Sequence, residues 1–256
     1  MADITGYVSG DVNDSGKVNW RGDQATAPVG QSIYKSSSVP LAELGARVVV
    51  GDRVFRYSRA AGTMQAGDLA QMNAVSLINV TAGATNPAGG KIFTFYFATS
   101  NAADVYTEGT LIAQSGTATN MGFTYRIKSQ PIVATTANAD LVLYDPLVRE
   151  INVTDKYSVF QNPYRGLTQC TAGTAPAMGV TPISIVSSDY FWLQTWGPCA
   201  AKVAAVSLGA PILAQNTGQV LGLTGTDGGG VKTQVGYSLQ LATASERGFV
   251  FLTLAP

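Results

Sequence analysis

The chain has no histidine, only two cysteines and few charged side chains for its length. Without histidine, neither a Ser-His-Asp nor a Cys-His catalytic group can form, and no metal site can have a histidine ligand. Cys170 and Cys199 are too few for a disulfide scaffold or a four-thiolate zinc site; they are either buried thiols or one bridge. The carboxylates are scattered beside predicted turns, and no spacing indicates a glycosidase pair. We therefore predict no enzyme activity, no catalytic residues and no cofactor.

Charge is low and balanced. Charged residues make up 12% of the chain, about half of the usual quarter, and 16 basic residues match 16 acidic ones. This balance removes the long-range field that a nucleic-acid-binding protein uses. Arg53, Arg56 and Arg59 fall on alternate sides of a predicted strand and cannot form one patch. A weakly charged surface suits a protein covered by neighbours in an assembly; a weakly charged secreted domain is the alternative.

Long apolar runs are also missing. No run approaches the length of a membrane span, and the N-terminus lacks the basic and apolar regions of a signal peptide. We therefore expect no membrane partner, and we expect the protein to fold in the cytoplasm where it is made.

What the sequence has in quantity is strand-like patterning. Short apolar or alternating segments recur between turn clusters, about every eight to twelve residues, and no segment has the helical period beyond about two turns. Residues 48–57 resemble two strands joined by a Gly51-Asp52 hairpin turn. The pattern predicts an all-β fold, an antiparallel β-sandwich or barrel with little helix. We expect an extended N-terminal arm over residues 1–40, then β regions 41–130 and 131–256, or one continuous domain over 41–256.

The segment 189–200 has the most distinctive composition, because it holds two of the three tryptophans. Strand alternation places Tyr190, Trp192 and Trp196 on one face. Aromatic stripes more often fill cores than bind ligands, so we predict that these three residues are structural core. Gly197-Pro198 is expected to end this strand, since proline cannot donate to a sheet ladder. Residues 92–98 and 190–195 are predicted to be interior strands.

A second motif, at residues 11–19, resembles a calcium loop. Asp11, Asn13 and Ser15 stand at the first, third and fifth places, where calcium ligands belong. The twelfth place, which requires a bidentate acid, is Gly22, and no helical pattern flanks the loop. A polar turn is therefore favoured over a metal site.

The aromatic segment also resembles a known family. Tyr190-Phe-Trp-Leu-Gln-Thr-Trp-Gly-Pro198 is similar to a motif in structural proteins of tailed bacteriophages, notably those that infect cyanobacteria and marine bacteria. The resemblance continues in order through further segments and spans roughly residues 45–254. These segments are 51–57 with Ala66-Gly67, 125–128, 143–147, 162–164, 235–237 and 248–252.

This resemblance implies a virion protein of the capsid cement or decoration type. Such proteins are not enzymes; they bind the major capsid protein on the outside of the head and commonly form homotrimers at its symmetry axes. A rigid β scaffold with low charge and a protruding arm suits that role, because weak contacts repeated over a shell hold collectively.

Two other functions compete with this expectation. A receptor- or glycan-binding tail protein would expose Trp192 or Trp196 for sugar stacking, but the sequence has no collagen-like, coiled-coil or repeated shaft segment. A secreted carbohydrate-binding module does not fit a chain without a signal peptide.

Overall fold

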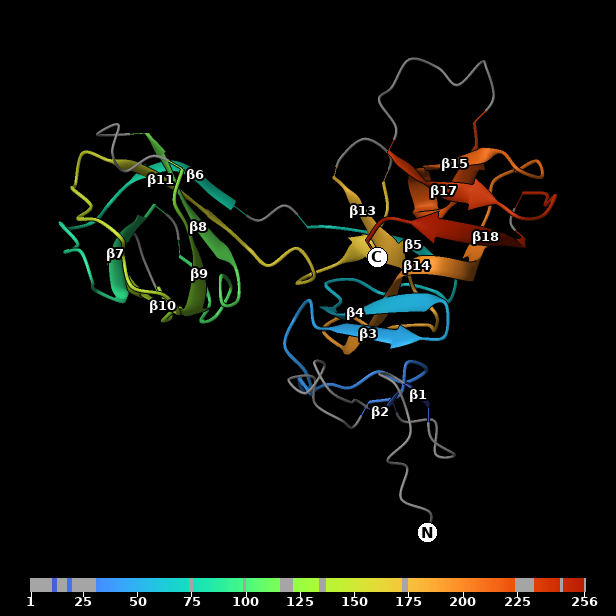
Figure 1. Cartoon of the computed structure of the whole chain (residues 1–256), viewed down its shortest axis with the longest axis horizontal. Helices are drawn as coiled ribbons and strands as arrows, with labels where there is room; N and C mark the ends of the chain where they lie inside the picture. Colours follow the sequence, from blue (N-terminus) through green and yellow to red (C-terminus); the bar gives the residue numbers. More distant parts are fainter. Residues whose placement is uncertain are drawn as a thin grey trace, which may run out of the picture. The chain divides into compact units, whose positions relative to one another are not determined.

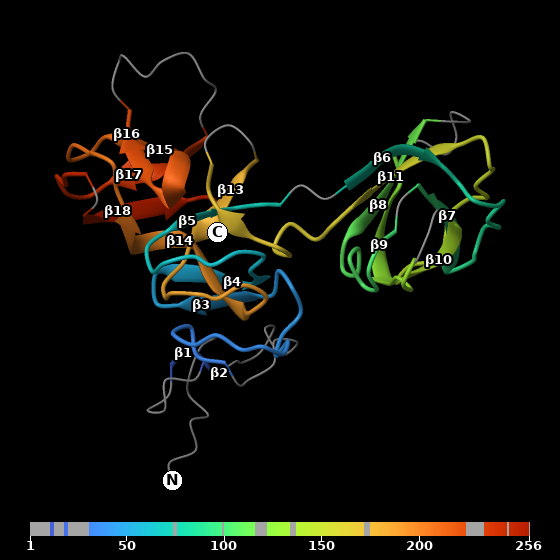
Figure 2. The ribbon, with the colours of Figure 1, turned by 180° about the vertical axis from the view of Figure 1, so that it is seen from behind.

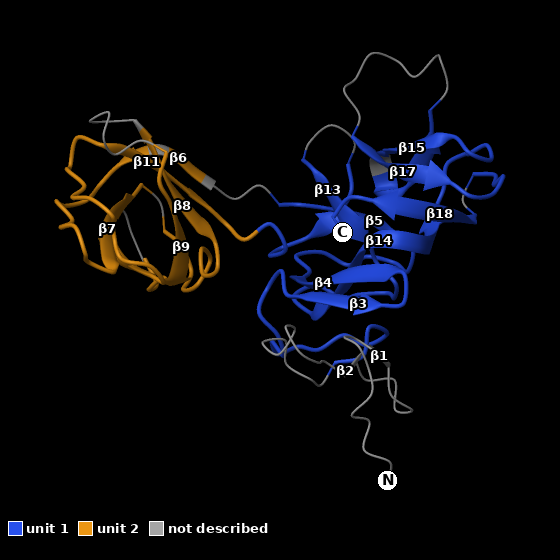
Figure 3. Cartoon of the chain, in the orientation of Figure 1, with its two compact units in different colours: residues 1–73, 163–256 blue, residues 74–162 orange. Residues whose placement is uncertain are grey.

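The structure is a computed structural model that describes residues 11–12, 18–19, 31–73, 76–98, 100–115, 122–133, 137–171, 175–223, 233–244 and 246–255. Its ribbon is shown from opposite sides (Figure 1 and Figure 2). The chain forms two compact units (Figure 3). Unit 1 contains residues 1–73 and 163–256, and unit 2 contains residues 74–162, which are inserted between the two parts of unit 1.

The fold is essentially all-β, as predicted, with two curled antiparallel sheets. The one helical element in the described ranges is a single 3-10 turn, η3 (Asn216–Gly218). Unit 1 contains β1 (Asp11–Val12), β2 (Val18–Asn19), β3 (Arg47–Val50), β4 (Arg53–Arg59), β5 (Leu69–Gln71), β12 (Thr168–Gln169), β13 (Ala177–Val180), β14 (Tyr190–Lys202), β15 (Pro211–Ala214), β16 (Val220–Gly222), β17 (Gln234–Ser238) and β18 (Arg247–Thr253).

Unit 1 is built on one ten-stranded sheet. Its main path runs β12-β5-β13-β14-β18-β17-β15-β16, and the β3-β4 hairpin joins it through β4, which pairs with β14. The hairpin is the one predicted from sequence: Val50 pairs with Arg53, and Gly51 has a φ of 62° in the two-residue turn. Strand β14 has the central place in this sheet (Figure 1).

The first half of β14 is covered on both faces, as predicted for an interior strand. On one face Trp192 packs with Ile33, Phe55 and Tyr57. On the other face Phe191 and Leu193 pack into a separate core. A third core lies farther along the sheet, under β18. Burial on both sides explains why this segment has large residues at successive positions.

The prediction that Gly197-Pro198 ends the strand is wrong. A β-bulge between Gln194 and Trp196 shifts the register with β4. Pairing with β4 ends at Trp196, where pairing with β18 begins, and β18 stays paired with β14 as far as Lys202. Gly197 makes the continuation possible, because it has a φ of 87° and a Cβ there would lie 2.3 Å from the Asp52 carbonyl oxygen. The Pro198 carbonyl accepts a hydrogen bond from the Gln194 side chain at 2.9 Å.

The same bulge overturns the predicted common face. Trp192 lies opposite Tyr57, but Trp196 lies opposite Val54, which points away from the Tyr57 face of β4. Trp196 is therefore only half-buried and does not belong to the Trp192 core. It lies instead on the outward face that β14 shares with β18.

Unit 2 is a curled six-stranded sheet in the order β6-β11-β8-β9-β10-β7. Its strands are β6 (Ser76–Thr81), β7 (Ile92–Phe97), β8 (Thr110–Ser115), β9 (Thr124–Ser129), β10 (Ala137–Leu143) and β11 (Lys156–Phe160). A bridge between Ala82, just after β6, and Phe95 of β7 joins the two ends of the path. The predicted interior strand β7 is thus a terminal strand of this path, although Phe93, Phe95 and Phe97 are fully buried.

The predicted domain limits also differ from the units. A boundary at residue 130 would separate β9 from β10, which are hydrogen-bonded neighbours in one sheet. The predicted arm, residues 1–40, cannot extend to residue 40. Ile33 is fully buried in the Trp192 core, and Gln31 donates a hydrogen bond to the Tyr190 carbonyl at 2.8 Å.

One local structure recurs six times in the described ranges. Six residues form isolated antiparallel bridges in three reciprocal pairs, with N···O distances between 2.8 and 3.1 Å: Met64 with Ile185, Asn86 with Ile151, and Val206 with Ala242. Each is followed by a tight turn and then by a strand, namely β5, β14, β7, β11, β15 and β18. We call them the bridge-and-turn pairs; two lie in unit 1 and one in unit 2.

The turns share their geometry as well. In all six, the amide four residues after the bridging residue donates to the carbonyl one residue after it, at 3.0 to 3.4 Å. Gly67, Gly89, Ser188 and Gly209 occupy the same turn position, with φ between 73° and 84°. The chain is therefore assembled from repeated pieces of similar local structure, which the sequence pattern alone did not reveal.

Candidate functional site

Trp192 is a structural residue, as predicted. Its side chain is 1% exposed, its Nε1 donates to the Gln31 carbonyl at 3.0 Å, and its ring meets that of Tyr57 edge-on at 5.0 Å. Tyr190 is half-buried and stacks on Tyr57 with ring centres 6.0 Å apart. Trp192 is therefore not available for the sugar stacking that the tail-protein alternative requires of it.

The outward face of β14, β18 and β17 has a different character. Trp196 meets Phe251 edge-on at 5.7 Å, and Phe251 stacks on Tyr237 at 5.1 Å with the rings 6° from parallel. Phe249 follows on the same face of β18 and is 46% exposed. We call these four residues the aromatic strip. They come from three adjacent strands and gather aromatic rings on one face of the sheet.

Most neighbours of the strip on this face are uncharged; the charged pair Lys202 and Arg247 lies beyond Phe249. Strand pairing places Pro198 opposite Phe251, Ala200 opposite Phe249, and Pro211 opposite Tyr237. The inward residues of β18, Val250 and Leu252, pack into a core and so leave this face to the strip. A partly exposed surface rich in Trp, Tyr and Phe and poor in charge has the composition of the centre of a protein–protein interface.

A hollow of about 250 Å³ lies beside the strip in unit 1. Its walls are mainly apolar or small, and its charged groups are two arginines. Its described lining residues are Tyr34, Arg53, Ala66, Gly67, Val180, Thr181, Pro182, Gln194, Cys199, Ala200 and Arg247. We call it the arginine hollow.

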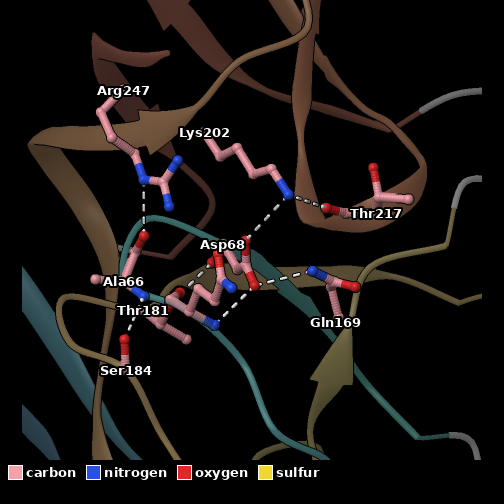
Figure 4. Close-up of polar contacts among 9 residues, drawn as sticks. Ala66, Asp68, Gln169, Thr181, Ser184, Lys202, Thr217 and Arg247 are labelled. Carbon is pink, nitrogen blue, oxygen red and sulfur yellow. Dashed lines mark hydrogen bonds and ion pairs between the residues drawn. The ribbon is translucent and has the colours of Figure 1, made fainter. Parts of the chain in front are cut away.

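Arg247 is held at the hollow by the turn before β5. Its Nε donates to the Ala66 carbonyl at 2.8 Å, which Figure 4 shows with the guanidinium turned toward this turn. The Arg247 side chain can lie this close to the turn because residue 67 is glycine. A Cβ there would lie 2.7 Å from Cδ and Nε of Arg247, and the φ of Gly67 is 84°.

Asp68, the next residue in this turn, is fully buried and fixes the turn through its side-chain contacts (Figure 4). Its Oδ2 accepts hydrogen bonds from the Gln65 amide at 2.8 Å and from Gln169 Nε2 at 2.9 Å. Its Oδ1 lies 4.0 Å from Lys202 Nζ and receives no hydrogen bond in the described part of the chain. The positive charge of Lys202 is thus balanced locally. Those of Arg53 and Arg247 form no ion pair with a described residue.

The cysteines are free thiols, so the bridge left open by the sequence is absent. Burial raises the pKa of Cys199 to about 12, although the nearby Arg53 acts in the opposite direction. Burial also raises the pKa of Cys170 to about 11. Both thiols are protonated at neutral pH and are poor nucleophiles, even though Cys199 lines the hollow.

The calcium-loop motif is only partly visible. Asp11 belongs to β1, which forms a two-stranded ladder with β2, while Asn13 and Ser15 lie outside the described residues. Elsewhere in the described ranges, no group of three or more Cys, Asp or Glu side chains is placed to hold a metal ion. The same ranges contain no helix long and apolar enough to cross a membrane.

No protein-family model, curated protein or solved structure matches this chain.

Sequence reasoning missed both parts of the candidate site. The strip depends on the bulge at residue 195, which turns Trp196 to the outward face, and on pairing with β17 and β18. The hollow is lined by both Arg53 and Arg247, which are far apart in the sequence. Residues 248–252 are apolar at successive positions, so no polar alternation in the sequence marked Phe249 and Phe251 as outward-facing.

Proposed function

We propose that this chain is a non-enzymatic structural protein of a tailed-phage virion, a decoration protein that binds the outer surface of the head and stabilises it. The observation that carries the proposal is the aromatic strip, a partly exposed set of aromatic rings that do not belong to a core. The ordered family-like segments supply the identity of the partner, the major capsid protein.

The composition of the strip favours a protein partner. Trp, Tyr and Arg contribute most of the binding energy in protein interfaces, and a rim of weakly charged residues allows water to be excluded. One strip is small, so a single contact would be weak. A shell presents the same site many times, and a homotrimer, which is part of this proposal, would engage several sites at once.

Copy number per virion tests the role. Quantified bands from purified particles should give hundreds of chains, a simple ratio to the major capsid protein. A count of a few chains per particle would contradict head decoration, and absence from particles would contradict a virion role altogether.

Matched tyrosine variants test the surface. Tyr237 in the strip and Tyr96 on β7 are exposed by 38% and 39%. Tyr237→Ala should weaken sedimentation with empty heads at least about tenfold, the size of a moderate interface hot spot. Tyr96→Ala should leave it unchanged. Equal effects of the two variants would show that the strip is not the docking surface. Light scattering on the free protein tests the trimer.

A receptor- or glycan-binding tail protein remains the second candidate. It is favoured by the parallel rings of Tyr237 and Phe251, since a flat aromatic face can stack on a sugar. Host-derived glycans that quench Trp196 fluorescence, together with a low copy number, would support this function instead.

A further inference from the structure

The arginine hollow carries two positive charges that the described chain does not neutralise. Arg53 uses Nη1 to donate to the Tyr34 hydroxyl at 3.2 Å, and Arg247 uses Nε to donate to the Ala66 carbonyl. Their remaining guanidinium N–H groups have no acceptor in the described ranges. An arginine fork with free donors is suited to an anion, above all to a planar carboxylate that can accept two parallel hydrogen bonds.

The walls of the hollow indicate what must be attached to that anion. Val180, Pro182 and Ala200 give it apolar sides, and burial keeps the Cys199 thiol neutral. A fully hydrated inorganic ion gains nothing from such walls. A carboxylate on a short methylene stem would place the stem against them and its charge at the arginines.

The hollow is also organised in advance of any ligand. Gly67 lets Arg247 lie against the turn, the Gly67 amide donates to the Thr181 carbonyl at 2.7 Å, and the Lys202 amide donates to the Gly67 carbonyl at 2.7 Å. Buried Asp68 fixes the same turn by accepting a hydrogen bond from the Gln65 amide. Binding would therefore require little further ordering, which reduces its entropic cost.

The position of the hollow connects it to the aromatic strip. Arg247, Phe249 and Phe251 are alternate residues of β18 and so lie on one face. Ala200, opposite Phe249, also lines the hollow. A partner resting on the strip would thus reach Arg247 with a neighbouring side chain. Arg53 lines the hollow from the Phe55 face of β4, where its guanidinium lies 5.6 Å from the centre of the Phe55 ring.

We propose that the arginine hollow is a carboxylate-binding site that receives a glutamate or aspartate side chain of the protein docked on the aromatic strip. This inference rests on the proposed function for the identity of the partner, but its chemistry can be tested without it. The acidic side chain sets the register of docking, and the strip supplies the apolar contact.

The direct test uses the purified full chain and two peptides that differ only in charge, acetyl-Phe-Glu-amide and acetyl-Phe-Gln-amide, with inorganic phosphate as a third probe. Binding is followed by NMR shifts of the arginine Nε–H groups and of the Gly67 amide. We expect the Glu peptide to bind about tenfold more tightly than the Gln peptide, and more weakly as salt is raised. Equal affinity for the two peptides, or tighter binding of phosphate, would overturn the carboxylate assignment.

Variants locate the effect. The double substitution Arg53→Gln with Arg247→Gln should abolish the preference for the Glu peptide, and Arg247→Lys, which keeps the charge but loses the fork, should reduce it. Arg149→Gln, an exposed arginine of unit 2, is the charge-matched control and should retain it. Retention of the preference in the double variant would refute the site. If the double variant does not fold, the comparison of probes on the unsubstituted chain still decides.

Binding to heads separates this inference from the proposed function. If the chain binds heads and the arginine variants bind equally well, the hollow is not used in docking and the inference fails alone. If the peptide preference is present but the chain does not bind heads, the proposed function fails and the carboxylate site remains.

Discussion

The two halves of β14 each contain a tryptophan but have different surroundings. Residues 190–195 lie between two cores, and Trp192 is 1% exposed. Residues 196–202 pair with β18 and keep one face outward, where Trp196 joins the aromatic strip. The comparison shows that a tryptophan's role is decided by register: one bulged residue converts a core position into a surface one.

Trp192→Ala should have the largest effect on stability. It removes a fully buried ring and the hydrogen bond to Gln31, and it should lower the free energy of unfolding of unit 1 by about 3–5 kcal/mol. Denaturant unfolding followed by tryptophan fluorescence measures this, because all three tryptophans belong to unit 1. A loss below about 1 kcal/mol would mean that the first half is not the core described here.

Gly197→Ala tests the point where the two halves meet. The new Cβ would clash with the Asp52 carbonyl and impose a strained φ, so we expect a loss of at least about 2 kcal/mol. Gly51→Ala is the matched control. Gly51 also has a positive φ, but a Cβ there meets nothing within 4 Å, so only the strain remains. Equal losses of unfolding free energy in the two variants would show that the close approach of residue 197 to the Asp52 carbonyl is unimportant.

Alkaline pH should destabilise both halves. Burial raises the pKa of Tyr57, beside Trp192, from 10.0 to about 12, and that of Cys199 from 9.0 to about 12. The unfolded chain loses these protons first, so the folded state binds more protons between these values. Stability is therefore complete below about pH 9 and falls as the pH rises toward about 12. Urea unfolding across this range measures the fall, and Tyr57→Phe with Cys199→Ala should flatten it.

Trp196→Ala should have the smallest effect on folding. The ring is half-buried and its main contact is one edge-on pair with Phe251, so about 1 kcal/mol is expected. Binding to heads should nevertheless fall as it does for Tyr237→Ala. A loss of stability as large as that of Trp192→Ala would remove the distinction between the two halves.

Local chemistry allowed part of this fold to be predicted. The β3-β4 hairpin follows from Gly51-Asp52 between alternating segments, and the burial of Trp192 follows from large residues at successive positions. The bulge at residue 195 could not be predicted, because it depends on which strand pairs with the second half of β14. The recurrent turns did leave a trace in Ala66-Gly67-Asp68 and Leu208-Gly209-Ala210, where a glycine precedes each strand.

Longer-range features left no such trace. Unit 2 begins and ends without a change in composition, so the predicted boundary fell at a turn inside it. Arg53 appeared as one of three arginines spread over two faces, which argued against a basic patch. Its partner in the hollow, Arg247, is supplied by the last strand, a contact that only tertiary structure creates.

The insertion of unit 2 has a consequence for synthesis on the ribosome. Strand β4 emerges early, but its partner β14 emerges only after every residue of unit 2 has been translated. Unit 2 has its strand partners within one continuous segment, so it can fold while unit 1 is still incomplete. Until β14 has been translated, the apolar residues of β3 and β4 have no core to pack into. The nascent chain is therefore most exposed to aggregation and chaperone binding in its first segment, and translation of the aromatic strand ends that exposure.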